Sequence, residues 1–296
     1  MLKISVVINT LNEEENLEYA INSIKWADEI IVCDMHSSDK TVEIAKKLGA
    51  KVYYYKKTDY VEPARNFAIS KATSNWILIL DADEEIPEML GNELRKIASQ
   101  PIRSDFLEIP RKNIIFGKWI RHSGWWPDYQ VRFFKKGSVI WSNKIHSKPK
   151  TLGEGIQLPA EEKFAIIHHN YQSIRQFLEK MNRYSSVEAE QLIKEGYQFN
   201  WKDLLGKPLN EFLSRFFANK SYEDGVHGLA LSFLQAFSNL AVYLKVWELS
   251  GHKEVAIEYV EITDEIKKAG ETVNWWIKQS AKSKRLFKEF FNKLIH

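Results

Sequence analysis

Short apolar runs alternate with amphipathic stretches through the first hundred residues of the chain. The apolar runs have the length of strands, and the last of them is wholly apolar, as expected of a strand buried on both faces. The expected strands are 4–8, 29–33, 51–55 and 76–80, and the stretches with helical spacing are 14–25, 38–48 and 62–72. This β-α-β-α-β-α-β order predicts a parallel sheet with helices on both faces.

The pattern changes after residue 103. Short extended pieces at 106–109, 130–134 and 139–141 suit a mixed extension of the sheet. From about Tyr171 the spacing is helical to the end of the chain. We therefore expect an α/β fold with a Rossmann-like, mainly parallel sheet flanked by helices in a domain over 1–170, followed by a helical C-terminal region over 171–296.

Composition and charge narrow the class of protein. Apolar residues make up 44% of the chain and charged residues 27%, which is a globular composition. The lone cysteine, Cys33, excludes a disulfide framework and suits a reducing compartment. The chain begins on a strand, so we expect no secretory signal and a cytoplasmic location. Net charge is +3, and a surplus of basic residues is confined to 277–296, which argues against nucleic acid as a partner.

Polar residues follow the predicted strands at the points where they end. Four carboxylates lie within five residues after the fourth strand, from Asp81 to Glu85. Like charges this close repel, so a divalent cation that grips a diphosphate would convert the repulsion into attraction. The alternative is an acidic turn that is merely solvated. No glycine-rich fingerprint follows the first strand, which argues against a dinucleotide cofactor.

Four segments together resemble the inverting family 2 glycosyltransferases with the GT-A fold, in that family's order and spacing. The segments are Val6-Val-Ile-Asn-Thr-Leu-Asn-Glu-Glu14, Asp34-x-x-Ser-x-Asp-x-Thr41, Ala64-Arg-Asn-x-Ala68 and Leu80-Asp-Ala-Asp-Glu84. Three later segments resemble a narrower branch, which includes the glucosyltransferases of the lipopolysaccharide inner core. These are Pro127-Asp-x-Gln-Val-Arg-Phe-Phe134, Ile145-His146 and Ile167-His-His-Asn-Tyr171. One residue departs from the pattern, because His36 stands where the family usually has glycine.

The resemblance implies a UDP-sugar as donor and Mn²⁺ or Mg²⁺ as cofactor. By matching position, the first loop would hold the nucleoside, Asp34 would contact the base, and Arg65 would approach the base or the phosphates. Asp81 and Asp83 match the D-x-D pair, with Asp83 as the direct metal ligand. The donor-binding residues are thus Thr10, Asn12, Glu13, Asp34, Arg65, Asp81 and Asp83.

A second metal ligand and the catalytic base are less well defined by the sequence. His146 could complete the metal shell, and at most one of the adjacent His168 and His169 is expected to serve a metal, because they point to opposite faces of a strand. Asp128 is the candidate base, with Glu84 and Glu85 as rivals and a turn-capping role as the alternative. Trp126 and Arg132 are expected to bind the acceptor, since stacked aromatics there could hold a sugar.

Two features of the helical region could serve either packing within the protein or contact with a membrane. Residues 225–244 carry no charged side chain and predict a buried or interfacial helix in preference to a true span. Apolar stripes at 209–217 and 287–294, flanked by basic residues, predict either packing on the core or peripheral contact with an anionic membrane. Such contact would place the enzyme at the inner face of the cytoplasmic membrane. The domain over 1–170 would then be the catalytic domain, and the helical region over 171–296 would serve acceptor binding and membrane association.

Three functions therefore remain open. The leading hypothesis is transfer of a hexose, glucose in the branch that the chain resembles, from a UDP-sugar to a hydroxyl of a glycolipid such as lipopolysaccharide core. The second is a polyprenyl-phosphate glycosyltransferase of the dolichyl-phosphate-mannose-synthase type, which needs no general base because its acceptor is a phosphate. The third is a degenerate sugar-binding protein.

Overall fold

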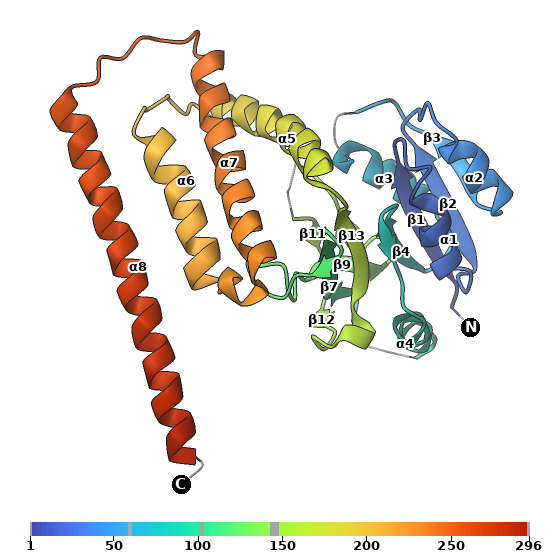
Figure 1. The fold of residues 1–296 in the computed structure, drawn as a ribbon. Coiled ribbons are helices and arrows are strands. Elements are labelled where there is room, and N and C mark those ends of the chain that lie inside the picture. Colours follow the sequence, from blue (N-terminus) through green and yellow to red (C-terminus); the bar gives the residue numbers. More distant parts are fainter. Residues whose placement is uncertain (1, 59–60, 101–103, 143–147, 295–296) are drawn as a thin grey trace. The chain divides into compact units, whose positions relative to one another are not determined.

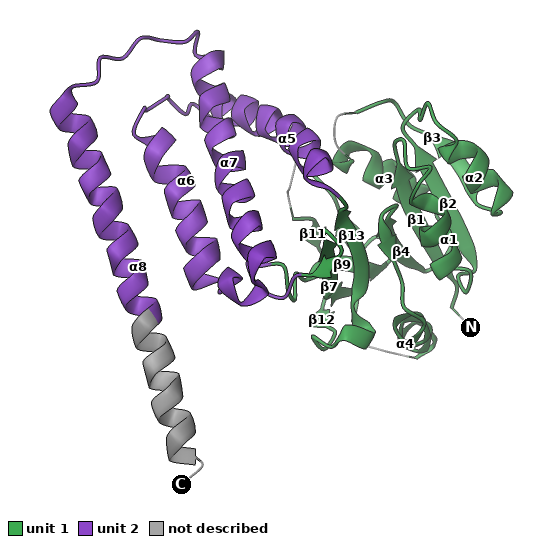
Figure 2. Ribbon diagram, in the orientation of Figure 1, with its two compact units in different colours: residues 1–119, 125–172 green, residues 120–124, 173–296 purple. Residues whose placement is uncertain are grey.

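The chain divides into two compact units in the computed structural model (Figure 2). The model describes residues 2–58, 61–100, 104–142 and 148–294, with side chains described as far as residue 280. Unit 1 comprises residues 1–119 and 125–172, and unit 2 comprises residues 120–124 and 173–296. The division at 172 falls close to the boundary expected at 170, and the short segment 120–124 is the part that the sequence did not assign to the helical region.

The four strands expected from the apolar runs lie side by side and form one half of the main sheet of unit 1 (Figure 1). They are β1 (Ile4–Thr10), β2 (Glu29–Asp34), β3 (Lys51–Tyr54) and β4 (Trp76–Asp81). β1 pairs in parallel with both β2 and β4, and β2 pairs in parallel with β3. The helices that connect or follow them are α1 (Leu17–Ser23), α2 (Thr41–Lys47), α3 (Glu62–Ser70) and α4 (Glu88–Ser99).

The two faces of this sheet bury separate apolar cores. Ile4, Val6 and Ile8 pack with buried residues of α1 and α4 on one face. Val7 packs with Ala68 of α3 on the opposite face. Because neighbouring residues of one strand point to opposite faces, a continuous apolar run is needed to fill both cores. This explains why the central strands read as unbroken apolar runs.

Three further strands extend the sheet with mixed polarity. β9 (Gln130–Lys135) pairs antiparallel with both β4 and β6 (Phe106–Ile109), and β12 (Gly155–Gln157) lies beside β6. The strand order is β12-β6-β9-β4-β1-β2-β3. The expected α/β architecture, a mainly parallel sheet with a mixed extension, is confirmed.

A second sheet begins within the acidic segment, at its last two residues. Its strands are β5 (Glu84–Glu85), β13 (Ile166–Tyr171), β7 (Arg111–Ile115) and β8 (Lys118–Trp119), in that order. β13 pairs antiparallel with β5 and parallel with β7. A small hairpin of β10 (Val139–Ile140) and β11 (Lys150–Thr151) and a short 3-10 turn (Glu162–Phe164) complete unit 1. The second sheet brings β7 and β13 to the carboxylates.

Unit 2 is helical, as expected. Its elements are α5 (Ile174–Lys194), α6 (Asp203–Leu213), a π-helical turn (Ser214–Ala218), a 3-10 turn (Ser221–Asp224), α7 (Val226–Leu249) and α8 (Tyr259–Leu294). α7 packs against both α5 and α6. The apolar stripe at 209–217 packs within this unit, because Phe212 contacts Phe233 of α7 and Phe217 contacts Trp276 of α8. That stripe is therefore part of the packing of the helices, not an unpartnered membrane surface.

A tight turn precedes α7. Gly225 adopts a positive φ of 67°, and a Cβ atom on Gly228 would lie 1.8 Å from the carbonyl oxygen of Ser221. The buried carboxylate of Asp224 accepts hydrogen bonds from the backbone N–H groups of Arg121 and His122. The glycines and the aspartate of this segment thus have a structural role, since they close the turn and anchor residues 120–124 to the helices.

One face of α7 is apolar and exposed. The exposed side chains are those of Val226, Leu229, Phe233, Phe237 and Leu244. α7 is long and apolar enough to cross a membrane, and 22% of its most apolar window is buried. This low burial disfavours the buried helix that was one of the two forms expected from the sequence. Length and composition by themselves are weak evidence that the helix spans a membrane. We call this set of five side chains the α7 apolar face.

Candidate functional site

The polar residues expected to meet do lie at one edge of the sheet. Thr10, the last residue of β1, is paired in register with Asp34, the last residue of β2. On the other side of β1, Asn9 is paired with Asp81 at the end of β4. The carboxyl ends of parallel strands share an edge, which is where open α/β sheets bind ligands. The topology thus gathers the expected donor-site residues.

The loops after β1 and β2 are tied together by side chains. The hydroxyl of Ser37 accepts a hydrogen bond from the backbone N–H of Asn12 (2.8 Å), and the Asn12 side-chain oxygen accepts one from the N–H of Ser38 (2.8 Å). Asp34 is buried, and its carboxylate accepts hydrogen bonds from Thr10 and Ser37. Asp34 therefore shapes the loop, whereas Asn12 is exposed at its tip.

Two further hydrogen bonds fix the loop after β1 and the start of α2. The backbone N–H of Glu13 donates to the hydroxyl of Thr41 (2.8 Å), and Asp39 accepts from the N–H of Thr41 (3.0 Å). Burial would raise the pKa of Asp39, but hydrogen bonds from Thr41 and from the backbone outweigh it and lower that pKa. Glu13 thus lies at the site edge, anchored through its backbone.

His36 takes the backbone conformation that the family's glycine would favour. Its φ is +63°, in the left-handed region that few non-glycine residues adopt. The imidazole ring stacks on Tyr54, with ring centroids 5.9 Å apart. Histidine in place of glycine at position 36 therefore does not change the backbone conformation that a glycine would favour in this loop.

Two arginines hold the two oxygens of Asp81. Arg65 Nη2 lies 2.9 Å from Oδ1, and Arg132 Nη2 contacts Oδ2. Burial would raise the pKa of Asp81, but Arg132 and Arg65 outweigh it and keep that pKa well below its ordinary value. Nη1 of Arg65 is buried and has no hydrogen-bond partner among the described residues. A buried donor without a partner is what a ligand oxygen would satisfy.

Arg132 lies beneath the carboxylates and is only 4% exposed. Its Nη2 also lies 2.8 Å from Glu84 Oε1. The expected contact with the acceptor does not fit this burial, because the guanidinium is turned toward Asp81 and the fully buried Glu84. We therefore revise its expected role from acceptor binding to support of Asp81.

Glu84 is fully buried and committed to structure. Its Oε2 accepts the backbone N–H of Asp81 (2.9 Å), and its Oε1 faces Arg132 and Arg111. A carboxylate without solvent access and with both oxygens engaged is unsuited to taking a proton from a substrate. Glu84 is thereby removed from the candidates for the base.

Asp128 is held by three side chains. Its Oδ2 lies 2.7 Å from Nη2 of Arg111 and accepts from Nδ2 of Asn113 (2.8 Å), and its Oδ1 accepts from Gln130 (2.9 Å). Burial would raise the pKa of Asp128, but Arg111, Asn113 and Gln130 outweigh it and lower that pKa. The carboxylate is ionised at neutral pH and firmly oriented. Arg111 and Asn113 were not singled out by the sequence.

Trp126, two residues before Asp128, is half-buried. Its ring meets the ring of Trp119 edge to face, with centroids 5.1 Å apart. The partly exposed indole remains in a position to offer a face to a sugar. The expected acceptor role of Trp126 thus stays a prediction.

A histidine approaches Asp83 from the second sheet. Nε2 of His168 lies 3.6 Å from Oδ2 of Asp83, and Nδ1 of His168 lies 2.6 Å from Oδ1 of Asn113. His169 points to the opposite face of β13 and contacts Glu85 at 2.6 Å. The two histidines therefore diverge as expected. His146, the metal ligand suggested by the sequence, lies outside the described residues.

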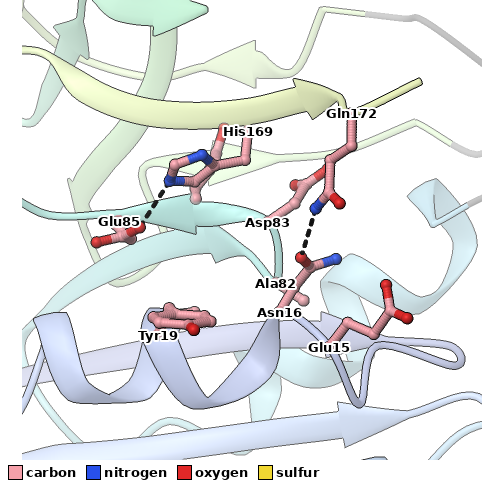
Figure 3. A pocket seen from close by; sticks show the side chains of 10 residues that line it. Glu15, Asn16, Tyr19, Ala82, Asp83, Glu85, His169 and Gln172 are labelled. Atoms are coloured by element: carbon pink, nitrogen blue, oxygen red, sulfur yellow. Dashed lines mark hydrogen bonds and ion pairs between the residues drawn. The ribbon is translucent and has the colours of Figure 1, made fainter. Parts of the chain in front are cut away.

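A cavity of about 350 Å³ adjoins Asp83 between α1, β5 and β13 (Figure 3). Glu85 and His169 are in direct contact in one wall of the cavity, and Gln172 donates a hydrogen bond to Asn16 in another. Tyr19 of α1 supplies an aromatic wall. Carboxylate and amide side chains can hydrogen-bond to a polar ligand, and the aromatic ring can stack against it. Glu85 lies in this cavity and remains a rival base.

Comparison with known proteins supports one family. The sequence pattern of the family "Glycosyl transferase family 2" matches residues 5–152 of this chain. A glycosyltransferase of Rickettsia typhi described as uncharacterized is 32% identical over 262 residues, covering 84% of this chain and 88% of the relative. The prophage-derived glycosyltransferase SunS of Bacillus subtilis is 25% identical and covers 84% of this chain and 63% of its own.

Two solved structures are also similar. S. aureus TarS 1–349 in complex with UDP is 16% identical with a TM-score of 0.45, covering 87% of this chain and 94% of that one. Glucosyl-3-phosphoglycerate synthase from Mycobacterium tuberculosis, in complex with Mn²⁺ and UDP-glucose, is 24% identical with a TM-score of 0.33, covering 36% and 43%.

Proposed function

The chain belongs to glycosyl transferase family 2 and is a glycosyltransferase, and on that basis we propose a metal-dependent, inverting transfer of a hexose from a UDP-sugar to a hydroxyl group. The observation that carries this proposal is the position of Asp81 between Arg65 and Arg132, with Asp83 two residues further on. A divalent cation and a buried arginine at one sheet edge suit the charge of a nucleoside diphosphate.

The residues present fit a divalent metal ion. Asp83 offers a carboxylate oxygen and His168 offers Nε2, and these atoms lie 3.6 Å apart, close enough to bind one ion. Within the part of the chain that the structure describes, no three His, Cys, Asp or Glu side chains converge on one point. Phosphate oxygens and water would complete the shell, as is common for such ions. When bound, the ion neutralises the charge that develops on the leaving diphosphate.

The proposed metal set favours Mn²⁺ over Mg²⁺. Mg²⁺ prefers oxygen ligands only, whereas an imidazole nitrogen is a good ligand for transition metals. His168 is the nitrogen ligand in this proposal, since His146 lies outside the described residues. Asp81 does not need to bind the ion directly, because both of its oxygens are held by arginines.

The donor would occupy the edge formed by β1, β2 and β4. Asn12 and Glu13 at the first loop would contact the nucleoside, with Thr10 and Asp34 supporting the loop beneath it. Arg65 would donate to a phosphate oxygen through the buried Nη1 that has no partner among the described residues.

Asp128 is the proposed general base. Inversion requires a carboxylate that removes the proton from the acceptor hydroxyl while that oxygen attacks the anomeric carbon from the side opposite the diphosphate. The orientation of Asp128 by Arg111, Asn113 and Gln130 supplies a fixed, ionised carboxylate next to Trp126. This arrangement favours a hydroxyl acceptor over the polyprenyl-phosphate alternative, which has no use for a base.

We propose a glycolipid acceptor, such as lipopolysaccharide core, presented at the inner face of the cytoplasmic membrane, with glucose as the transferred hexose. The support is the likeness of the segments 127–134 and 167–171 to that branch and the exposed α7 apolar face. Five large apolar side chains along one helix are the type of surface that inserts into the boundary of a bilayer. The basic residues of 278–293 would add attraction to anionic lipids.

A donor screen tests the proposed function. Thermal unfolding is followed with a panel of UDP- and GDP-sugars, with and without Mn²⁺. We expect UDP-sugars to raise the unfolding temperature only with the metal present, because ligands that bind the folded state stabilise it. Stabilisation by GDP-sugars alone, or by none of the panel, would contradict the proposed donor.

A further inference from the structure

Asn113 lies at the centre of the site and is completely buried. It belongs to β7 and stands in register with His168 of β13. Its Oδ1 lies 2.6 Å from Nδ1 of His168, and its Nδ2 donates to Oδ2 of Asp128 at 2.8 Å and to the carbonyl oxygen of Trp125 at 2.9 Å. One amide thus touches both the proposed metal ligand and the proposed base.

The chemistry of its partners fixes which way the amide points. The backbone carbonyl of Trp125 can only accept, and so can the ionised carboxylate of Asp128. The NH₂ group of Asn113 must therefore face these two oxygens, which leaves its carbonyl oxygen facing His168. A carbonyl oxygen can only accept, so Nδ1 of His168 must carry a proton.

This proton determines the state of the other ring nitrogen. In a neutral imidazole with a proton on Nδ1, Nε2 has a free lone pair. Nε2 is the atom that lies 3.6 Å from Oδ2 of Asp83. A hydrogen bond from the distal nitrogen of a ligating histidine also fixes the ring orientation.

We propose that Asn113 is a positioning residue that sets the tautomer of His168 for metal binding and at the same time orients Asp128. This inference rests on the proposed function, and it makes the metal site and the base two ends of one buried hydrogen-bonded unit. Asn113 acts through its neighbours and is not expected to touch substrate.

The tautomer of His168 can be measured in the metal-free protein. Long-range ¹H–¹⁵N correlation spectra of histidine-labelled protein distinguish a proton on Nδ1 from one on Nε2, and His168→Gln identifies the His168 signals. We expect the proton on Nδ1 in the unmodified protein. A proton on Nε2 would overturn the inference, and this outcome does not depend on any Asn113 variant or on the reaction.

Two substitutions separate the contact of Asn113 with His168 from its contact with Asp128. Asn113→Ala removes both, and we expect the Kd for Mn²⁺, measured by electron paramagnetic resonance in the presence of UDP, to rise about 10–100-fold. Asn113→Asp keeps an acceptor for Nδ1–H but places a second carboxylate against Asp128. We expect near-normal Mn²⁺ binding in Asn113→Asp and loss of transfer.

The matched control is Ser5→Ala, which removes a buried hydrogen bond to Glu29 near the start of β1, at the other end of the strand. It should lower stability and leave the Kd for Mn²⁺ unchanged. An Asn113→Ala protein that folds and binds Mn²⁺ as tightly as Ser5→Ala would overturn the inference. Failure of the unmodified protein to bind Mn²⁺ with UDP would instead contradict the proposed function, and the tautomer measurement would still decide the role of Asn113.

Discussion

Arg111 grips the carboxylate of Asp128 through two nitrogens, with Nε at 2.8 Å and Nη2 at 2.7 Å from Oδ2. The same guanidinium reaches Glu84 Oε1 at 3.3 Å. Burial would lower the pKa of Arg111, but Glu84 and Asp128 outweigh it and raise that pKa. The proposed base is therefore one member of a buried ionic network that continues through Glu84 to Arg132.

Asp128→Asn should spare donor binding and reduce transfer by about 10²–10⁴-fold, the usual span for loss of a general base. The amide keeps the size of the side chain but cannot take the acceptor's proton. Transfer rates and UDP affinity are measured in parallel. Near-normal transfer would move the role to Glu85, and an equal loss of UDP affinity would make Asp128 a structural residue.

Arg132→Met should lower the free energy of unfolding by about 3–5 kcal/mol, because it leaves Asp81 and Glu84 facing each other without their shared cation. The control is Arg175→Met, which breaks an exposed ion pair with Glu179 and should cost less than about 1 kcal/mol. Urea unfolding measures both. Equal costs would show that Arg132 has no special place in the network.

Glu29 should make stability depend on acid pH. Burial would raise its pKa, but Lys51, Ser5 and Thr73 outweigh it and lower the pKa from 4.5 to about 2. Because folding lowers this pKa, the ionised carboxylate stabilises the folded protein above pH 4.5, and that stabilisation is lost as the pH falls toward 2. Unfolding free energies of the unmodified protein and Glu29→Gln should therefore converge as the pH is lowered from 6 to 3. A constant difference would contradict this pKa.

The α7 apolar face should mediate membrane binding. Replacing Phe237 and Leu244 together by Glu removes two exposed apolar side chains and adds two negative charges. We expect binding to anionic liposomes to weaken at least tenfold, since burying one such side chain contributes about 1.5–3 kcal/mol. Leu152→Glu, at a still more exposed position in unit 1, should change liposome binding little. Unchanged binding by the double variant would exclude this face.

The sequence predicted which residues meet at the proposed donor edge because that edge follows from local patterns. Apolar runs locate β1, β2 and β4, and the parallel order brings Thr10, Asp34 and Asp81 together whatever the details of packing. The same logic placed Asp83 beyond the strand end. Among the residues of the second sheet near Asp83, the sequence singled out the pair His168 and His169 but not Asn113.

That second sheet leaves almost no signal in the sequence. β5 has two residues, too few for a periodic pattern, and its partner β13 lies far along the chain. Arg111 and Asn113 belong to a strand whose letters, Arg-Lys-Asn-Ile-Ile, show no alternation. The burial of Arg132 was also not predictable from alternation along the strand, since the next two residues, Phe133 and Phe134, are both buried. Long-range strand pairing, not local propensity, sets these positions.

The most direct test of the account is metal-dependent turnover of a UDP-sugar by the unmodified protein and by Asp83→Ala. Glu93→Ala, which removes a partly exposed carboxylate of α4 that pairs with Lys96, is the matched control. We expect UDP release from the unmodified protein and the control only with Mn²⁺ or Mg²⁺, more strongly with Mn²⁺, and none from Asp83→Ala although it melts cooperatively. Equal metal-dependent UDP release from Asp83→Ala would contradict the proposed site.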